Sequence, residues 1–202
     1  MKLIAITDGA QTIHDLATKI SHIHNVVDYI HIREKSKSAR EILSLLELLE
    51  AGGVCKEKLV LHDRLDIALL TNNPNIHLPS HSLPVKNVRA AYPHLRIGRS
   101  VHSVEEAQQA EADGADYVLY GHCFETQCKE GKVPNGIDLI RQMKKVVRIP
   151  IFAVGGITRA RIPLLQENDA DGVAFMSSIF ELDNAYEYAC SLATRCKNNE
   201  EG

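Results

Sequence analysis

Among the ten histidines of the chain, His122 stands where a side chain can do proton chemistry. The residues from Tyr117 to Tyr120 form an apolar run typical of a buried strand, and Gly121 bends the backbone just before His122. Because an imidazole titrates near neutral pH, a histidine at the tip of a rigid strand can donate or accept a proton. We predict that His122 is a general acid/base. A histidine packed under the following loop is the alternative.

A second set of residues has the composition of a phosphate site. Gly155 and Gly156 end one apolar run, and Met176, Ser177 and Ser178 end the next. Glycines let the backbone approach a ligand, and exposed N–H groups near the start of a helix attract anions. Each of the two turns follows one of two successive strand-like runs, so we predict that together they bind a phosphate. A tight strand-to-helix turn is the alternative for the glycine pair.

Charged residues after two earlier runs are candidates for binding the rest of the substrate. Residues of one parity share a strand face, so Arg33 should point the same way as His31. A guanidinium can hold a carboxylate or phosphate through two parallel hydrogen bonds. Lys35 is a further candidate, although this segment also reads like a solvated run of charges. Asp63 either orients such a cation or caps the helix after it.

Three polar residues complete the predicted substrate contacts. Ser100 ends the run before that of His122 and could hydrogen-bond either the substrate or His122. Thr126 and Lys129 lie in the segment 125–135, which has no periodicity, and they reach the site only if this segment folds over it as a lid. Cys123 has the parity opposite to that of His122 and is predicted to lie in the core.

The fold that positions these residues follows from the pattern of the whole chain. Eight strand-like runs start near residues 2, 28, 58, 75, 94, 117, 151 and 173, and segments of helical periodicity alternate with them. Such alternation indicates parallel βαβ units, and eight units predict an α/β fold, a closed (β/α)8 TIM barrel, with residues 1–202 as one domain. A doubly wound open sheet is the alternative, but the glycine-rich loop expected after its first strand is absent.

Composition limits the class of protein. The 202 residues are 45% apolar, enough for a full core, and a net charge of −3 gives no reason to expect nucleic acid or an anionic membrane as partner. An odd number of cysteines, five, without a Cys-x-x-Cys pair favours reduced thiols in a cytosol over disulfides or a zinc site. The first apolar run reaches a polar turn at Asp8, too early for a signal peptide or a membrane span. We expect a cytoplasmic protein.

Several motifs together resemble the thiamine phosphate synthase superfamily over nearly the whole chain. They are His31–Lys35, His62–Ala68, Gly98–His102, Ala115–Val118, Ala153–Ile157 and Ala170–Ala174. Within that superfamily the chain looks most like the TenI branch, the thiazole tautomerases. The similarity is greatest in the residues Asp28–Glu34 and Arg96–Glu105. Gly121-His122 stands where that branch carries its acid/base histidine.

The resemblance implies an isomerase of thiamine biosynthesis. Its substrate would be a small phosphorylated thiazole: a 2-carboxy-dihydrothiazole ethyl phosphate that is converted to the aromatic carboxythiazole. The implied reaction needs neither cofactor nor metal, and the implied assembly is a homodimer. His122 would be the acid/base, Gly156, Ser177 and Ser178 would hold the phosphate, and Arg33 would contact the carboxylate or the ring.

Departures from the synthase pattern favour this narrower assignment. Synthases of the superfamily carry Asn-Asp on the third strand and acidic residues after the fourth, which hold Mg²⁺. Here the corresponding residues are His62-Asp63 and Leu78–His81, so a single carboxylate remains. One carboxylate is a poor site for a hard cation. Two alternatives stay open: a Mg²⁺-dependent thiamine phosphate synthase, and a non-catalytic sensor that binds thiazole or thiamine phosphates.

Overall fold

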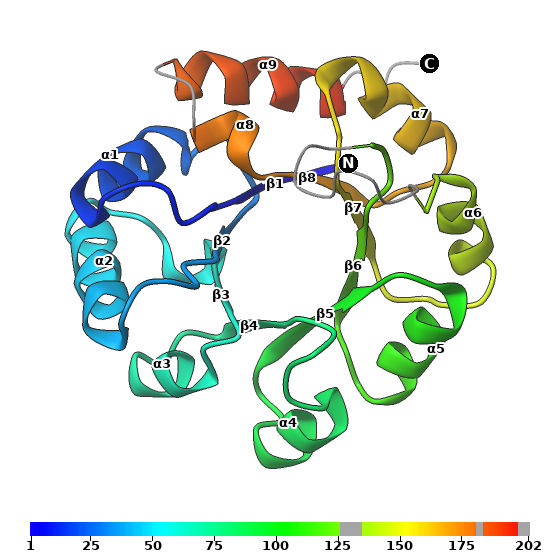
Figure 1. The fold of residues 1–202 in the computed structure, drawn as a ribbon, viewed down its shortest axis with the longest axis horizontal. Helices are drawn as coiled ribbons and strands as arrows, with labels where there is room; N and C mark the ends of the chain where they lie inside the picture. The colour runs from blue at the N-terminus through cyan, green and yellow to red at the C-terminus, as the bar shows by residue number, and fades with distance from the viewer. Residues whose placement is uncertain (126–134, 181–183, 198–202) are drawn as a thin grey trace.

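The computed structural model describes residues 1–125, 135–180 and 184–197. Within these ranges, parallel strands form one closed barrel in the order β1 to β8, and helices surround it (Figure 1). The strands are β1 (Lys2–Ile6), β2 (Tyr29–Ile32), β3 (Leu59–His62), β4 (Asn75–Leu78), β5 (Arg96–Val101), β6 (Tyr117–Gly121), β7 (Ile151–Val154) and β8 (Gly172–Phe175). The predicted (β/α)8 barrel is confirmed.

The helices follow the predicted alternation, with short additions. They are α1 (Ile13–Ile23), α2 (Ala39–Ala51), α3 (Leu65–Leu70), α4 (Val85–Ala91), α5 (Val104–Ala112), α6 (Asp138–Lys144), α7 (Ile162–Glu167), α8 (Ser177–Phe180) and α9 (Ala185–Lys197). Two 3-10 turns, η1 (Lys56–Lys58) and η3 (Arg159–Arg161), were not predicted, and neither was α8. The 3-10 turn η3 leads directly into α7.

Side-chain caps at Thr12, Ser38 and Ser103 fix where α1, α2 and α5 begin. The Ser38 hydroxyl accepts from the Glu41 N–H while the Glu41 carboxylate accepts from the Ser38 N–H, a full capping box at the start of α2. At the start of α5 only half of such a box is present. Ser103 accepts from the Glu106 N–H, but the Glu106 carboxylate accepts from the N–H of His102, one residue earlier.

The strands divide their side chains between two cores. Outward-facing residues pack with the helices in one large cluster, whereas the barrel interior holds a small apolar cluster of Ile4, Ile6, Tyr117, Leu119, Phe152 and Ala174. Between Tyr117 and Tyr29 lies the guanidinium of Arg96, 4.4 Å from the centroid of each ring. Stacking on two aromatic faces stabilises a cation that has few polar partners inside a barrel.

Two smaller observations concern the state of the cysteines and the length and apolar character of the helices. All four described cysteines, at 55, 123, 190 and 196, are free thiols, and Cys123 lies in the core as predicted. In the part of the chain that the structure describes, no helix combines the length and the apolar character needed to cross a membrane.

Candidate active site

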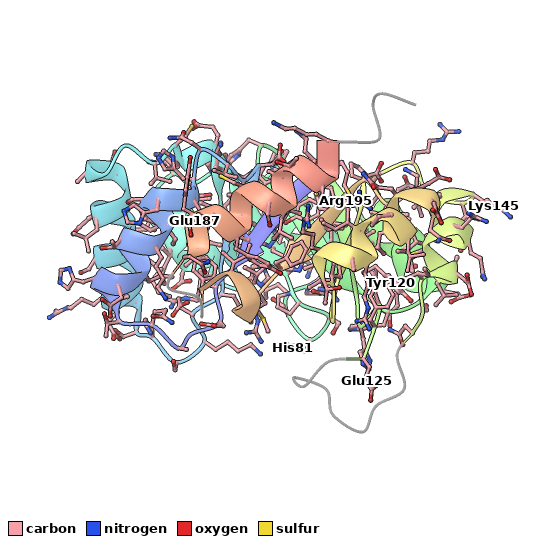
Figure 2. All side chains as sticks on the ribbon, turned by 90° about the horizontal axis from the view of Figure 1, so that it is seen from above. His81, Tyr120, Glu125, Lys145, Glu187 and Arg195 are labelled. Atoms are coloured by element: carbon pink, nitrogen blue, oxygen red, sulfur yellow. The ribbon has the colours of Figure 1, made fainter. Side chains whose placement is uncertain are left out.

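The residues predicted to act on the substrate follow six different strands, β2, β3, β5, β6, β7 and β8, or end them. Because the strands are parallel, their carboxyl ends meet at one edge of the barrel, the edge that carries the active site in this architecture. Figure 2 marks this edge: His81, after β4, and Glu125, after β6, lie on the same side of the barrel.

His122 follows β6 directly, in an unusual backbone conformation. Its φ angle is 65°, in the left-handed region that non-glycine residues rarely occupy. Strict alternation along β6 would place residue 122 on the outer side with Val118 and Tyr120, and the left-handed turn breaks that alternation. The side chain is 5% exposed, so it is almost completely shielded from bulk water.

The turn after β7 explains how His122 is held. A Cβ added at Gly155 would lie 2.9 Å from both N and Cα of His122, and one added at Gly156 would lie 2.3 Å from the carbonyl oxygen of Glu125. The Phe124 N–H donates to the Gly155 carbonyl at 3.0 Å, and the Asn135 N–H donates to the His122 carbonyl at 2.9 Å. The glycine pair is therefore required for close backbone packing, whether or not it also meets a phosphate.

The sequence analysis missed an arginine beside this turn. The guanidinium of Arg161, on η3, donates to the Gly156 carbonyl and lies 4.6 Å from the centroid of the Phe124 ring. It thus joins the segment after β6 to the turn after β7. The signal was available, since this arginine follows the Gly-Gly turn by five residues.

The two predicted phosphate loops lie side by side. Strands β7 and β8 are hydrogen-bonded neighbours, with Val154 opposite Ala174, so the turn at Gly155 and Gly156 and the turn at Met176 follow adjacent strands. Ser177 and Ser178 begin α8 immediately after Met176. The two loops are therefore neighbours, and their binding of a phosphate stays a prediction.

The charged segment after β2 is more buried, and makes more specific polar contacts, than a solvated run of charges would. The Glu34 side chain is fully buried and pairs with Lys37 at 3.2 Å, while the Arg33 N–H donates to the Thr7 hydroxyl at 2.8 Å. Arg33 and exposed Lys35 both lie close enough to His62 for their charges to lower its pKa. Both candidate cations thus share the mouth of the barrel with β3.

Asp63 and Ser100 have partners that the sequence did not predict. Asp63 has a φ of 57°, and one of its carboxylate oxygens accepts from the Ser82 hydroxyl. It does not cap α3, whose N-cap is Arg64 and has no side-chain cap. The Ser100 hydroxyl and His77 Nε2 are hydrogen-bonded at 2.8 Å. Thr126 and Lys129 lie outside the described residues, as do residues 126–134 of the predicted lid.

Three histidines on adjacent strands form a cluster that the sequence analysis did not foresee. His31 Nδ1 lies 2.7 Å from His62 Nε2, and the rings of His62 and His77 stack with centroids 4.4 Å apart. His77 Nδ1 also lies 3.3 Å from the Tyr117 hydroxyl. His62 and His77 are directly opposite in the β3–β4 register, which brings them together.

Burial keeps this cluster uncharged. Desolvation is the main cause that lowers the pKa of each histidine, to about 3 for His77 and well below the ordinary 6.5 for His31 and His62. Neighbouring positive charges act in the same direction: Arg96 on His31, Arg33 and Lys35 on His62, and Arg99 on His77. At neutral pH the cluster offers hydrogen-bond donors and acceptors and carries no net charge of its own.

Comparison with known proteins places the chain in a family. The family model described as "Thiamine monophosphate synthase" (TMP-TENI) matches residues 3–179. A protein of Chlorobium luteolum named "Thiamine-phosphate synthase" is 36% identical over 94% of this chain and 90% of its own length. A protein of Aquifex aeolicus named "Putative thiamine-phosphate synthase 2" is 32% identical over 89% of this chain and 98% of its own.

Solved structures agree with the sequence comparison. The thiamine phosphate pyrophosphorylase of Pyrococcus furiosus superposes with a TM-score of 0.82 at 26% identity, covering 98% of this chain and 96% of the other. With a family model that spans most of its length and relatives above 30% identity, the chain belongs to the thiamine monophosphate synthase (TMP-TENI) family.

Proposed function

We propose that the protein is a thiazole tautomerase, an isomerase that converts a 2-carboxy-dihydrothiazole ethyl phosphate to the aromatic carboxythiazole phosphate. The observation that carries the proposal is the ligand chemistry at the ends of β3 and β4. His62 and His77 stand there with one carboxylate, Asp63, whose oxygen already accepts from Ser82. Imidazoles and one carboxylate do not fit Mg²⁺, which prefers oxygen ligands in octahedral geometry.

In the proposed reaction one proton moves between two carbons of the substrate. His122 removes the proton from ring C2, the electron pair shifts through the ring, and the same imidazole returns a proton to the exocyclic carbon. One double bond leaves the exocyclic position as the ring becomes aromatic, so atoms and electrons balance without a co-reactant. Shielding of His122 from water supports such an internal transfer, because it keeps the abstracted proton from exchanging with solvent.

The remaining predicted residues would bind the two anionic ends of the substrate. Arg33 would pair with the carboxylate and stabilise the negative charge that spreads onto it when C2 loses its proton. The backbone at Gly155 and Gly156, with the start of α8 at Ser177 and Ser178, would hold the phosphate. Adjacency of β7 and β8 supports that pairing of loops.

The decisive experiment follows the ultraviolet spectrum of the dihydrothiazole isomer as it aromatises. Replacement His122→Gln should slow turnover by roughly 10²–10⁴-fold, the usual worth of proton-transfer assistance. The control is His81→Gln, which changes an exposed histidine on the same edge of the barrel and should leave the rate unchanged. Turnover by the His122 variant at the wild-type rate would refute the assignment.

Thiamine phosphate synthase is the second candidate, and the names of the curated relatives favour it over the tautomerase. It requires the pyrimidine pyrophosphate and Mg²⁺ as additional reactants. Incubation of the protein with both, together with the thiazole phosphate, distinguishes the two. Formation of thiamine phosphate faster than tautomerisation would select the synthase. Ligand binding without either reaction would instead select a sensor.

A further inference from the structure

We propose that His31, His62 and His77 form a binding site for a late first-row transition-metal dication, of the Zn²⁺ or Co²⁺ class, inside the mouth of the barrel. One ring nitrogen from each histidine lies within 4.8 Å of those of the other two. The three residues come from the adjacent strands β2, β3 and β4, so a rigid sheet holds their backbones. The proposal goes beyond the tautomerase assignment and does not depend on it.

The distances leave room for an ion after small side-chain adjustments. Four-coordinate zinc binds imidazole nitrogen at about 2.0–2.1 Å, which separates the ligand atoms by roughly 3.4 Å. His31 Nδ1 and His62 Nε2 are closer than that, at 2.7 Å, and share one proton that the metal would replace. The widest separation in the group, at most 4.8 Å, would have to close by about 1.4 Å, within reach of ring rotation.

The surroundings of His77 provide the second interaction that metal-bound histidines require. Its Nε2 faces the Ser100 hydroxyl at 2.8 Å, and its Nδ1 faces the Tyr117 hydroxyl at 3.3 Å. Whichever nitrogen binds the ion, the other keeps a hydrogen-bond partner that fixes the tautomer and the orientation of the ring.

Ligand type and local charge define what the site would take. Three neutral imidazoles without a carboxylate suit zinc, cobalt, nickel or copper and do not suit magnesium or calcium. The cations Arg33, Lys35, Arg96 and Arg99 surround the cluster and would weaken a bare dication. His62 is partly exposed at the mouth, so the fourth coordination position is open to an anionic ligand such as a carboxylate. We expect micromolar rather than nanomolar affinity.

The test uses the full chain without a polyhistidine tag, stripped of metal by a chelator. Titration with Co²⁺ should give the intense visible absorption of a four-coordinate site and saturate at one ion per chain. Calorimetric titration with Zn²⁺ should give the same stoichiometry. The variant His62→Asn should lose this binding, whereas His81→Asn, the same substitution at an exposed histidine on the same edge, should keep it.

A second measurement protects the test against a variant that fails to fold. X-ray absorption at the zinc edge of the wild-type complex should show nitrogen ligands at about 2.0–2.1 Å with the scattering pattern of imidazole. The proposal would be overturned by no stoichiometric binding to the wild type, by equal binding to a folded His62→Asn variant, or by sulfur in the coordination shell. Equal loss of binding in the His81 variant would also overturn it.

Discussion

Gly155 lies directly against the backbone of His122: a Cβ at position 155 would meet both N and Cα of His122 at 2.9 Å. Gly155 also has a φ of 106°, a backbone conformation that residues other than glycine rarely adopt. The turn after β7 and the turn after β6 are thus a matched pair, and the position of the proposed acid/base depends on both.

Gly155→Ala should therefore reduce both stability and turnover. We expect a loss of about 3 kcal/mol in the free energy of unfolding, from backbone strain and the clash together. Urea denaturation and the thiazole time course measure the two effects. Gly53→Ala is the control, because Gly53 also has a positive φ, 76°, but its added Cβ would meet nothing within 4 Å. Equal losses in the two variants would show that strain alone, and not contact with His122, explains the effect.

Gly98→Ala should disturb the barrel interior. A Cβ at Gly98 would lie 2.0 Å from Cζ of Tyr117, so the ring must shift, which disturbs its contacts with His77 and Arg96. We expect a destabilisation of about 3 kcal/mol. Tyr117→Phe, which keeps the ring and removes only the hydroxyl near His77, should cost about 1 kcal/mol. Thermal unfolding followed by circular dichroism compares the two, and a mild effect of Gly98→Ala would contradict the packing described above.

The stability of the metal-free protein should fall as the pH is lowered through the range where His77 titrates in the unfolded chain. Burial lowers the pKa of His77 from 6.5 to about 3, so below pH 6.5 the unfolded chain binds the proton and the folded protein does not. Between about pH 7.5 and pH 5, this one group should cost about 2 kcal/mol. The contribution of neutral His77 to the free energy of unfolding is complete above pH 6.5, and it is lost as the pH falls towards 3.

Urea denaturation in the presence of a chelator measures that dependence. In the variant His77→Gln, the free energy of unfolding should change between about pH 7.5 and pH 5 by about 2 kcal/mol less than in the wild type. The pH dependence that comes from His31 and His62 should remain. Identical pH dependence in the variant and the wild type would mean that His77 is protonated in the fold.

Arg161→Ala should weaken substrate binding more than chemistry. The guanidinium holds the Gly156 carbonyl and the Phe124 ring, so its loss should loosen the proposed phosphate turn. We expect KM to rise about 10-fold with a smaller change in kcat. Arg159→Ala, at the exposed neighbour on the same 3-10 turn, is the control and should leave KM unchanged. A fall in kcat at unchanged KM would instead implicate Arg161 in positioning His122.

The sequence by itself determined the order of the elements and the edge of the barrel at which the candidate site residues lie. These features are local: an apolar run of four to six residues, a serine such as Ser38 with Glu41 three residues later, or Gly121 after a strand. The placement of His122, Gly155 and Met176 at one edge followed from parallel strands alone. Motif resemblance added the family, which the comparisons confirmed.

Only the tertiary structure decided which side chains meet across the barrel. His31, His62 and His77 are far apart in sequence, and the register of β2, β3 and β4 brings them together. Ser100 turned out to contact His77 because β4 and β5 are neighbours, and Gly155 proved to be a packing requirement of His122. Such contacts depend on the closure and stagger of the whole barrel, and no local pattern of residues encodes them.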